Sequence, residues 1–233
     1  MMAVNLHCVI LGPPGAGKGT QAERLAVQWS VPKISTGDIL RLAVADGFYS
    51  DWSVASKLNT GKLVSDEIVI EIIRKRFEDE DTQTGFVLDG FPRTIVQAEA
   101  LDKLMAGLDS LKVVNLVVPH DELLRRLSYR RICGVCGALR GWEKEEIEKD
   151  SCLRCGGDLI RRKDDLQPVI IERLKVYEKR TQPLVDYYSD RTGFCEISGH
   201  QGADEVAEAL EAALSPSSEV STTAEVSEED YSR

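Results

Sequence analysis

The strongest strand candidates in this chain are three apolar runs that are continuous rather than alternating. They occupy residues 9–11, 86–88 and 113–118. A continuous run makes both faces of a strand apolar, and a strand of that kind is stable only when helices cover it on both sides. The pattern therefore predicts a parallel sheet buried between two layers of helices.

Helical periodicity fills much of the sequence between and after these runs. Apolar residues recur at helical spacing in residues 66–77, 94–108 and 168–188, and more weakly in 203–214. Strand candidates that alternate with helix candidates are typical of the α/β class. We therefore predict a three-layer α/β domain with a central parallel sheet and a ligand site at the carboxyl ends of its strands.

Two stretches interrupt this rhythm, and a third ends it. Residues 35–64 are helical and sparsely apolar, whereas residues 132–163 are rich in Cys, Gly and charge. Both are predicted to be insertions at the mouth of the site, which leaves residues 1–34, 65–131 and 164–214 as the core domain. Residues 215–233 are acidic and rich in Ser and Thr, so they are predicted to form a disordered tail.

The first strand candidate leads directly into Gly-Pro-Pro-Gly-Ala-Gly-Lys-Gly-Thr at residues 12–20. A glycine-rich loop between a strand and a helix can turn its backbone N–H groups toward phosphate oxygens, and Lys18 adds a point charge. The general pattern has Ser or Thr after the lysine as a magnesium ligand, but Gly19 stands there. This motif predicts a phosphate-binding loop (P-loop); the alternative is a glycine-rich turn without a ligand. The residues predicted to bind the phosphates are Gly15, Ala16, Gly17, Lys18, Gly19 and Thr20.

Four cysteines form a C-x2-C-x15-C-x2-C pattern at Cys133, Cys136, Cys152 and Cys155. Two CxxC turns followed by glycine can complete a tetrahedron of thiolates, so we predict structural Zn²⁺ without an open position. Iron and an unmetallated pair of dithiols are the alternatives. Cys8 and Cys195 lie in strand-like runs and are predicted to be buried core thiols.

Charge and hydropathy restrict the partners that this protein is expected to have. The net charge is -10, from 29 basic and 39 acidic residues, which argues against a nucleic-acid partner. The acidic residues between the two cysteine pairs argue against a nucleic-acid-binding zinc ribbon. No hydrophobic run is long enough to span a membrane and no signal segment is recognisable, so we expect a cytoplasmic protein without a membrane partner.

Several segments together resemble the signature segments of the adenylate kinase family. They are residues 12–20, 35–41, 89–94 and 162–165, and the resemblance runs in order from about residue 5 to 214. The cysteine insertion resembles the zinc-bearing lid of long bacterial members. The resemblance implies reversible, Mg²⁺-dependent phosphoryl transfer from ATP to AMP giving two ADP, by a monomer. It also makes residues 35–64 a nucleoside monophosphate (NMP)-binding insertion and residues 132–163 a lid.

The resemblance also implies a role for each cation of the site. Phosphoryl transfer depends mainly on positioning and on cationic clamps, for which the planar fork of arginine is suited. Arg41 and Arg93 would hold the AMP phosphate, and Arg126 and Arg130 the ATP phosphates. Asp89 would reach magnesium-bound water, a role that Asp38 either shares or exchanges for that of a helix N-cap. The implied catalytic residues are Lys18, Asp89, Arg93, Arg126, Arg162 and Arg173.

The implied AMP site contains Arg162 and Arg173, which would bridge the two nucleotides, and a group that would read the adenine. The full set is Thr36, Arg41, Lys62, Leu63, Val64, Gly90, Arg93, Gln97, Arg162 and Arg173. Gln201 falls near the implied donor adenine, where the family commonly has Lys-Pro, so the choice of donor stays open. Asp164 and Asp165 are interpreted either as anchors for lid arginines or as a solvated charged turn.

Three other functions fit parts of the sequence. The same fold could use GTP or accept another nucleoside monophosphate, and a nucleotide-binding protein without turnover would keep the P-loop. A zinc-ribbon nucleic-acid binder conflicts with the charge. The sequence departs from zinc-lid members at Ala138-Leu139-Arg140, where Thr-Tyr is usual, and at Phe48, Tyr49 and Trp52.

Overall fold

The computed structural model describes residues 6–47, 52–106, 111–140 and 151–215 of the 233-residue chain. Its centre is a five-stranded parallel sheet in the order β2-β3-β1-β4-β8. All six residues of β1 are buried, as the continuous apolar run predicts. The strands are β1 (Leu6–Leu11), β2 (Lys33–Ser35), β3 (Gly85–Asp89), β4 (Lys112–Val117) and β8 (Phe194–Ser198).

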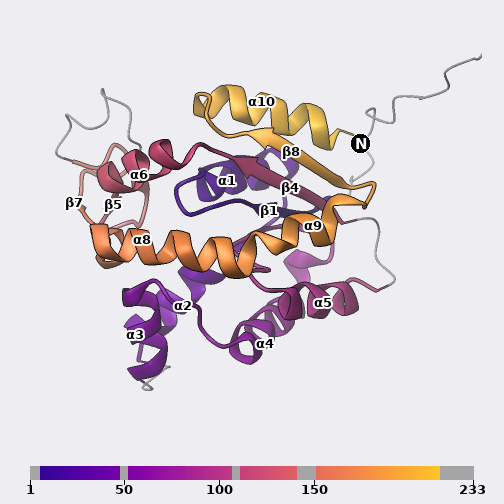
Figure 1. Cartoon of the computed structure of the whole chain (residues 1–233), viewed down its shortest axis with the longest axis horizontal. Coiled ribbons are helices and arrows are strands. Elements are labelled where there is room, and N and C mark those ends of the chain that lie inside the picture. The colour runs from indigo at the N-terminus through magenta and orange to yellow at the C-terminus, as the bar shows by residue number, and fades with distance from the viewer. Residues whose placement is uncertain (1–5, 48–51, 107–110, 141–150, 216–233) are drawn as a thin grey trace, which may run out of the picture.

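Helices cover both faces of this sheet, so the predicted three-layer α/β architecture is confirmed (Figure 1). One hydrophobic cluster joins the sheet to α1, α6, α8 and α10, and a second joins it to α2, α3, α4, α5 and α9. The helices are α1 (Lys18–Trp29), α2 (Thr36–Ala45), α3 (Trp52–Thr60), α4 (Asp66–Arg76), α5 (Ile95–Leu104), α6 (His120–Tyr129), α8 (Gln167–Val176), α9 (Pro183–Ser189) and α10 (Ala203–Leu214).

Residues 131–160 carry a small second sheet. The strands β5 (Arg131–Cys133), β6 (Leu139–Arg140) and β7 (Leu159–Ile160) pair antiparallel in the order β6-β5-β7. They lie beside α6 and the start of α8, at the left of Figure 1. Two short turns, η1 (Glu80–Thr82) and η2 (Lys163–Asp165), precede β3 and α8.

The long helix predicted over residues 168–188 is wrong as a single element. It is divided into α8 and α9 by a π-helical turn, η3 (Tyr177–Thr181), in which the N–H of Gln182 donates to the carbonyl of Tyr177 at 2.9 Å. Pro183 begins α9. Proline has no N–H to donate and its ring crowds the carbonyl four residues earlier, so a regular α-helix cannot continue through this position.

Other predictions need smaller corrections. Strand β2 was not predicted, because a three-residue strand carries little periodicity. Helix α5 ends at Leu104, short of the predicted residue 108. Cys8 is fully buried as expected, whereas Cys195 is only partly buried. The alternative role of Asp38 as a helix N-cap is also wrong. The side chain of Ser35 caps α2 by accepting the Asp38 N–H at 3.3 Å.

Some predictions fall on residues that the structure does not describe. These are the acidic tail beyond Ser215, the acidic residues 143–150 and the aromatic residues Phe48 and Tyr49. Among the residues that are described, no helix combines the length and the apolar character that a membrane crossing requires.

Candidate active site and metal centre

The P-loop joins β1 to α1, and Lys18 is the first residue of that helix. Its ammonium group folds back over the loop and donates to the carbonyl oxygens of Gly12 at 2.7 Å and Pro13 at 2.8 Å. Burial lowers the pKa of Lys18 to about 7, and the Asp89 carboxylate only partly opposes this effect. The loop therefore presents a cation that a bound anion would stabilise.

Three loop glycines are required by close packing and backbone conformation. Gly12 has a φ of 137°, and a Cβ there would lie 2.8 Å from the Leu116 carbonyl oxygen of β4. Gly15 has a φ of 89° and would bring a Cβ within 3.0 Å of Leu127. Gly17, with a φ of 96°, forms the left-handed N-cap of α1. The absence of a Cβ at Gly12 and Gly15 allows the loop backbone to lie close to β4 and α6.

The surroundings of Gly19 explain why glycine replaces the Ser or Thr that usually follows the lysine of the P-loop motif. A Cβ at this position would lie 3.2 Å from Asp89 Oδ2 and 3.5 Å from Leu139 Cδ1 of the second sheet. A serine here would crowd the Asp89 carboxylate at the carboxyl end of β3. Glycine avoids this contact and leaves the Asp89 carboxylate close to the loop, where its charge acts on Lys18.

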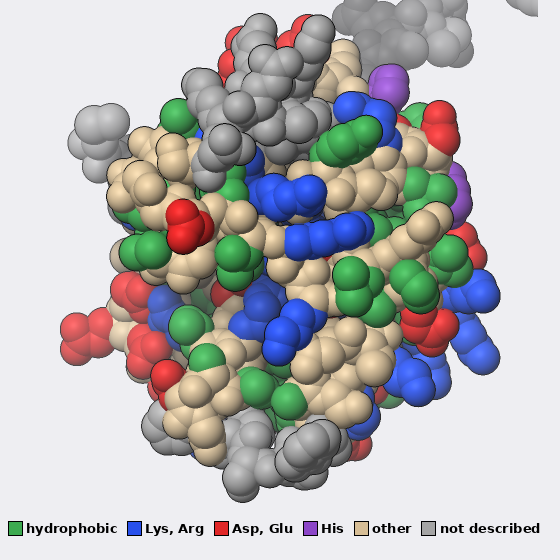
Figure 2. Space-filling view, turned by 90° about the vertical axis from the view of Figure 1, so that its left-hand side faces the viewer, with side chains coloured by type: hydrophobic (Ala, Val, Ile, Leu, Met, Phe, Trp, Pro, Cys, Tyr) green, Lys and Arg blue, Asp and Glu red, His purple; other side chains and the backbone are tan. Residues whose placement is uncertain are grey.

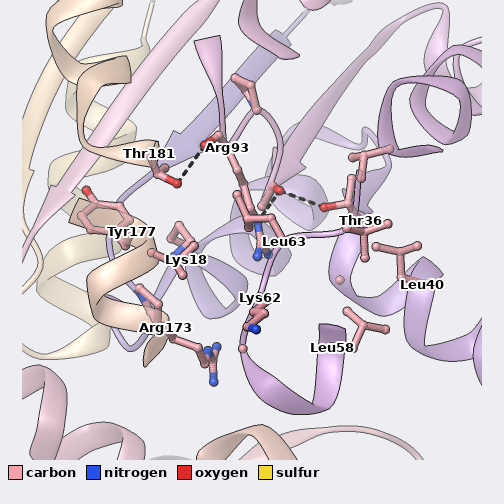
Figure 3. Close-up of a pocket in the computed structure, with 18 of the residues that line it drawn as sticks. Lys18, Thr36, Leu40, Leu58, Lys62, Leu63, Arg93, Arg173, Tyr177 and Thr181 are labelled. Atoms are coloured by element: carbon pink, nitrogen blue, oxygen red, sulfur yellow. Dashed lines mark hydrogen bonds between the residues drawn. The ribbon is translucent and has the colours of Figure 1, made fainter. Parts of the chain in front are cut away.

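A cleft opens beside the loop, between α2, α3, α8 and the loop that follows β3, and Figure 3 shows its lining. The carbonyl of Gly90 accepts hydrogen bonds from Thr36 Oγ1 at 2.9 Å and from Arg93 Nε at 2.8 Å. Leu40, Leu58 and other apolar residues form a further part of the lining. Of the residues predicted to bind AMP, the cleft is lined by Thr36, Arg41, Lys62, Leu63, Val64, Gly90, Arg93, Gln97 and Arg173.

Gln97 is held in the cleft at both ends of its amide. Its oxygen accepts the Arg93 N–H at 2.8 Å, and its nitrogen donates to Asp66 Oδ1 at 2.7 Å. Thr94 donates to the same Asp66 oxygen at 3.0 Å. Sequence reasoning did not identify Asp66 as part of the site, because its partners lie 28 and 31 residues away.

A buried carboxylate holds the arginines between the lid and α8. Asp165 has no exposed surface, and it accepts hydrogen bonds from Arg130 Nε at 2.7 Å and from Arg173 at 2.8 Å. Asp164 forms a further ion pair with Arg173 at 3.2 Å. The structure therefore favours the anchoring interpretation of Asp164 and Asp165 over a solvated turn.

The cations near the cleft outnumber the carboxylates that neutralise them. Burial, reinforced by the charge of Arg130, lowers the pKa of both Arg162 and Arg173 to about 10. Burial also lowers the pKa of Arg93. Arg162 Nε is buried without a hydrogen-bond partner among the described residues. Figure 2 shows Lys and Arg side chains gathered near the middle of the face that carries the lid strands and α3. Such a cluster favours a polyanionic ligand.

The Asp38 carboxylate is bound by an arginine of its own helix. It forms an ion pair with Arg41, three residues along α2. This pair and the Arg162 charge lower the pKa of Asp38 against the opposing effect of burial. The carboxylate is therefore already committed to a cation.

A second, smaller pocket lies on the other side of the P-loop, where α10 begins. Arg126 is buried there, paired with Glu122 at 2.6 Å and donating to the His200 carbonyl at 3.3 Å. Hydrogen bonds from Arg125 and Arg126 lower the pKa of Glu122 to about 2. Of the residues predicted to bind ATP, this pocket is lined by Ala16, Gly17, Thr20, Arg126 and Gln201.

The four lid cysteines converge on one point. Their sulfur atoms all lie within 4.8 Å of one another, with Cys133 and Cys155 3.4 Å apart and Cys136 and Cys152 3.6 Å apart. Tetrahedral zinc with bonds of about 2.3 Å to sulfur needs sulfur atoms at about this spacing. The residues present therefore fit a structural zinc ion.

The two cysteine turns repeat the same backbone pattern. Gly137 N donates to the Cys133 carbonyl at 3.0 Å, and Gly156 N donates to the Cys152 carbonyl at 2.8 Å. Both glycines have left-handed φ angles, 69° and 72°, which each turn needs to present its two sulfurs to one side.

Comparisons with known proteins agree with this site. The family model described as adenylate kinase matches residues 10–193. The chain belongs to the adenylate kinase family. It is 42% identical over 212 residues to the adenylate kinase of Archaeoglobus fulgidus, covering 90% of this chain and 98% of that one. It is 45% identical over 216 residues to the adenylate kinase of Caldicellulosiruptor bescii, covering 90% and 97%.

Membership of the adenylate kinase family makes this chain a nucleoside monophosphate kinase, a phosphoryl-transferring enzyme with nucleotide substrates. It accounts for two pockets on either side of one P-loop, since the reaction joins two nucleotides at their phosphates. The resemblance stated from the sequence is therefore confirmed at the level of family and function.

Proposed function

We propose that this adenylate kinase family member transfers the terminal phosphoryl group of ATP to AMP, reversibly, and forms two ADP. The observation that carries the proposal is the convergence of Lys18, Arg93 and Arg173 on the cleft next to the P-loop. In the reaction, an AMP phosphate oxygen attacks the terminal phosphorus of ATP. The bond from that phosphorus to the oxygen it shares with the next phosphate breaks.

The cleft supports AMP as the acceptor. Arg41 and Arg93 bind its phosphate in this proposal, and Leu40, Leu58 and Val64 provide an apolar wall for its base. One amide hydrogen of Gln97 is donated to Asp66. We assign the second amide hydrogen of Gln97 to a ring nitrogen of adenine, with Thr36 and the backbone of residues 62–64 nearby.

The pocket at the start of α10 supports the donor site. Residues of the P-loop bind the ATP phosphates through their backbone N–H groups. Arg126 and Gln201, which line this pocket, lie beside the donor nucleotide in this proposal. Arg130 is proposed to contact the donor phosphates from the root of the lid. Arg162 and Arg173 bridge the two nucleotides. In the transition state, negative charge spreads over the transferred phosphoryl group. The arginines stabilise this charge from positions that are already fixed.

Mg²⁺ is proposed to arrive with ATP and to neutralise part of its phosphate charge. Asp89 is the residue that we propose would hold it, through bound water, with Thr20 next to the same loop. The carboxylate fits this role because Gly19 leaves the space in front of Asp89 Oδ2 open. Zn²⁺ is proposed to be bound by the four lid cysteines and to act only structurally.

We further propose the division of labour that the sequence suggests. Residues 1–34, 65–131 and 164–214 form the core domain, residues 35–64 the NMP-binding insertion and residues 132–163 the lid. Four reduced thiols suit a reducing cytoplasm, and the net charge of -10 does not suit nucleic acid. The proposed working form is a monomer.

The test is a phosphotransfer assay that combines ATP or GTP with AMP, GMP, CMP or UMP in the presence of Mg²⁺. Turnover confined to AMP with one donor supports the proposal and identifies that donor. Turnover with another monophosphate at equal efficiency would assign a different acceptor. Folded, metal-loaded protein without turnover on any pair would contradict the proposal.

A further inference from the structure

Thr181 reaches the acceptor cleft from an element that sequence motifs do not mark. Its side chain is buried, lines the cleft and donates from Oγ1 to the backbone carbonyl of Arg93 at 3.0 Å. The two residues are 88 positions apart, and Figure 3 shows the bond across the cleft wall. Thr181 is therefore a tertiary contact of the site and not a local helix cap.

This bond completes the fixation of Arg93. The Arg93 N–H donates to Gln97 at 2.8 Å, and Arg93 Nε donates to the Gly90 carbonyl at 2.8 Å. With Thr181 on the carbonyl, side chains hold both polar groups of the Arg93 backbone. The guanidinium therefore projects into the cleft from a backbone that cannot readily rotate.

The π-helical turn places Thr181 at this position. In an α-helix, consecutive residues are about 100° apart, so residues four apart drift by about 40° around the axis. The π turn between Tyr177 and Thr181 contains one residue more than an α-helical turn, as the Gln182-to-Tyr177 hydrogen bond shows. Arg173, Tyr177 and Thr181 all line the same cleft as a result. Single π turns are frequent at functional sites.

We propose that Thr181 is a positioning residue of the acceptor site, which sets the Arg93 guanidinium for the phosphate of the acceptor nucleotide. This inference rests on the proposed function, in which Arg93 binds the AMP phosphate. Thr181 and Arg173 belong to one continuous run, α8 and the π turn. The same segment thus carries one phosphate-binding arginine and fixes another.

Thr82 provides a matched control within the same chain. It is as buried as Thr181, and its Oγ1 donates to the carbonyls of Asp79 at 2.8 Å and Phe77 at 3.2 Å. Thr82 does not line the cleft. Thr181→Val and Thr82→Val each remove a buried hydroxyl while keeping the shape of the side chain. Thr181→Ser keeps the hydroxyl and removes only a methyl group.

The experiment titrates each variant with AMP alone by calorimetry and then measures KM for AMP and for ATP separately. Loss of one buried hydrogen bond that orients a charged group predicts a rise of roughly three- to tenfold in the AMP Kd and KM of Thr181→Val. Its KM for ATP is expected to stay within about twofold of the wild-type value, since one hydrogen bond to Arg93 does not touch the donor pocket. Thr181→Ser is expected to retain wild-type AMP affinity, and Thr82→Val to lose only thermal stability.

Three results would overturn the inference: unchanged AMP affinity in Thr181→Val, equal weakening of AMP and ATP, or weakened AMP binding in Thr82→Val. Thr181→Ala, with the same expectation, replaces Thr181→Val should the latter not fold. A double variant with Arg93→Ala adds an independent check, because a residue that acts through Arg93 has no further effect once Arg93 is gone. Failure of the wild-type protein to bind or phosphorylate AMP would contradict the proposed function itself, and so is distinguishable from these results.

Discussion

The guanidinium of Arg130 binds the carboxylate of Asp165 through two of its nitrogen atoms, and that carboxylate is completely buried. Arg130 directly precedes β5, and Asp165 is the last residue of η2, two residues before α8 begins at Gln167. The pair therefore holds together the two ends of the segment that carries the second sheet. Arg173 shares the same carboxylate at 2.8 Å.

Asp165→Asn is expected to destabilise the fold strongly, because it removes a fully buried carboxylate that leaves Arg130 without its ion-pair partner and Arg173 with Asp164 alone. Breaking a buried ion pair in this way costs about 3–5 kcal/mol in the free energy of unfolding. Asp102→Asn is the control, since Asp102 pairs with Arg191 at a half-exposed position, where the expected loss is at most about 1 kcal/mol. Denaturant titration of both variants measures the difference. Equal losses would show that burial of Asp165 does not raise its contribution.

Lys18→Ala is expected to leave a folded protein whose turnover is lower by at least about a hundredfold, the scale of losing a fixed charge at the reacting phosphates. Lys33→Ala is a suitable control, because Lys33 forms a surface pair with Glu23 at 2.7 Å. Circular dichroism checks the fold, and the coupled assay measures kcat. Wild-type turnover in Lys18→Ala would remove this residue from the mechanism.

The lowered pKa of Lys18 predicts proton uptake when a nucleotide polyphosphate binds. With a pKa of about 7 in the free protein, Lys18 is mostly neutral at higher pH, and a bound phosphate favours its charged form. Uptake on ATP binding should therefore approach one proton near about pH 8 and vanish below about pH 6. Calorimetry in buffers of different ionisation enthalpy measures it. Lys18→Arg stays charged throughout, so the same uptake in that variant would contradict the assignment.

The lowered pKa of Lys18 also predicts how the stability of the ligand-free protein changes with pH. The pKa of Lys18 is lower in the folded state than the ordinary value of 10.5, so between about pH 7 and that value the unfolded chain binds more protons. The contribution of Lys18 to the free energy of unfolding is thus least favourable below pH 7 and improves as pH rises through this window. Comparing wild-type protein with Lys18→Met by denaturant titration isolates it: the difference between the two should change with pH in this range, and a constant difference would contradict the shift.

Removal of the metal is expected to unfold the lid locally, because four thiolates crowded around one point lose the ion that compensates their charge. Cys136→Ser should lose bound zinc and lower the thermal midpoint, whereas Cys195→Ser, outside the cluster, should retain one zinc per chain. Elemental analysis of protein purified without chelators measures the metal. Absence of zinc from the wild-type protein would rule out the proposed zinc centre.

Local pattern was sufficient for much of the fold. Continuous apolar runs predicted β1, β3 and β4, because a central parallel strand needs apolar residues on both faces. The P-loop and the cysteine pairs were also readable, since each is a short motif whose residues act on one ligand. Pro183 carried a signal for the break after α8 that helical periodicity alone did not use.

The amino-acid sequence by itself thus determined the α/β class, the P-loop, the cysteine cluster and the family. Only the tertiary structure decided which groups hold the site in place: Asp66 on Gln97, Asp165 on Arg130 and Thr181 on Arg93. These pairs are 31, 35 and 88 residues apart. Periodicity and motif spacing report what neighbours along the chain share, whereas such contacts depend on how the sheet and its helices bring distant segments together.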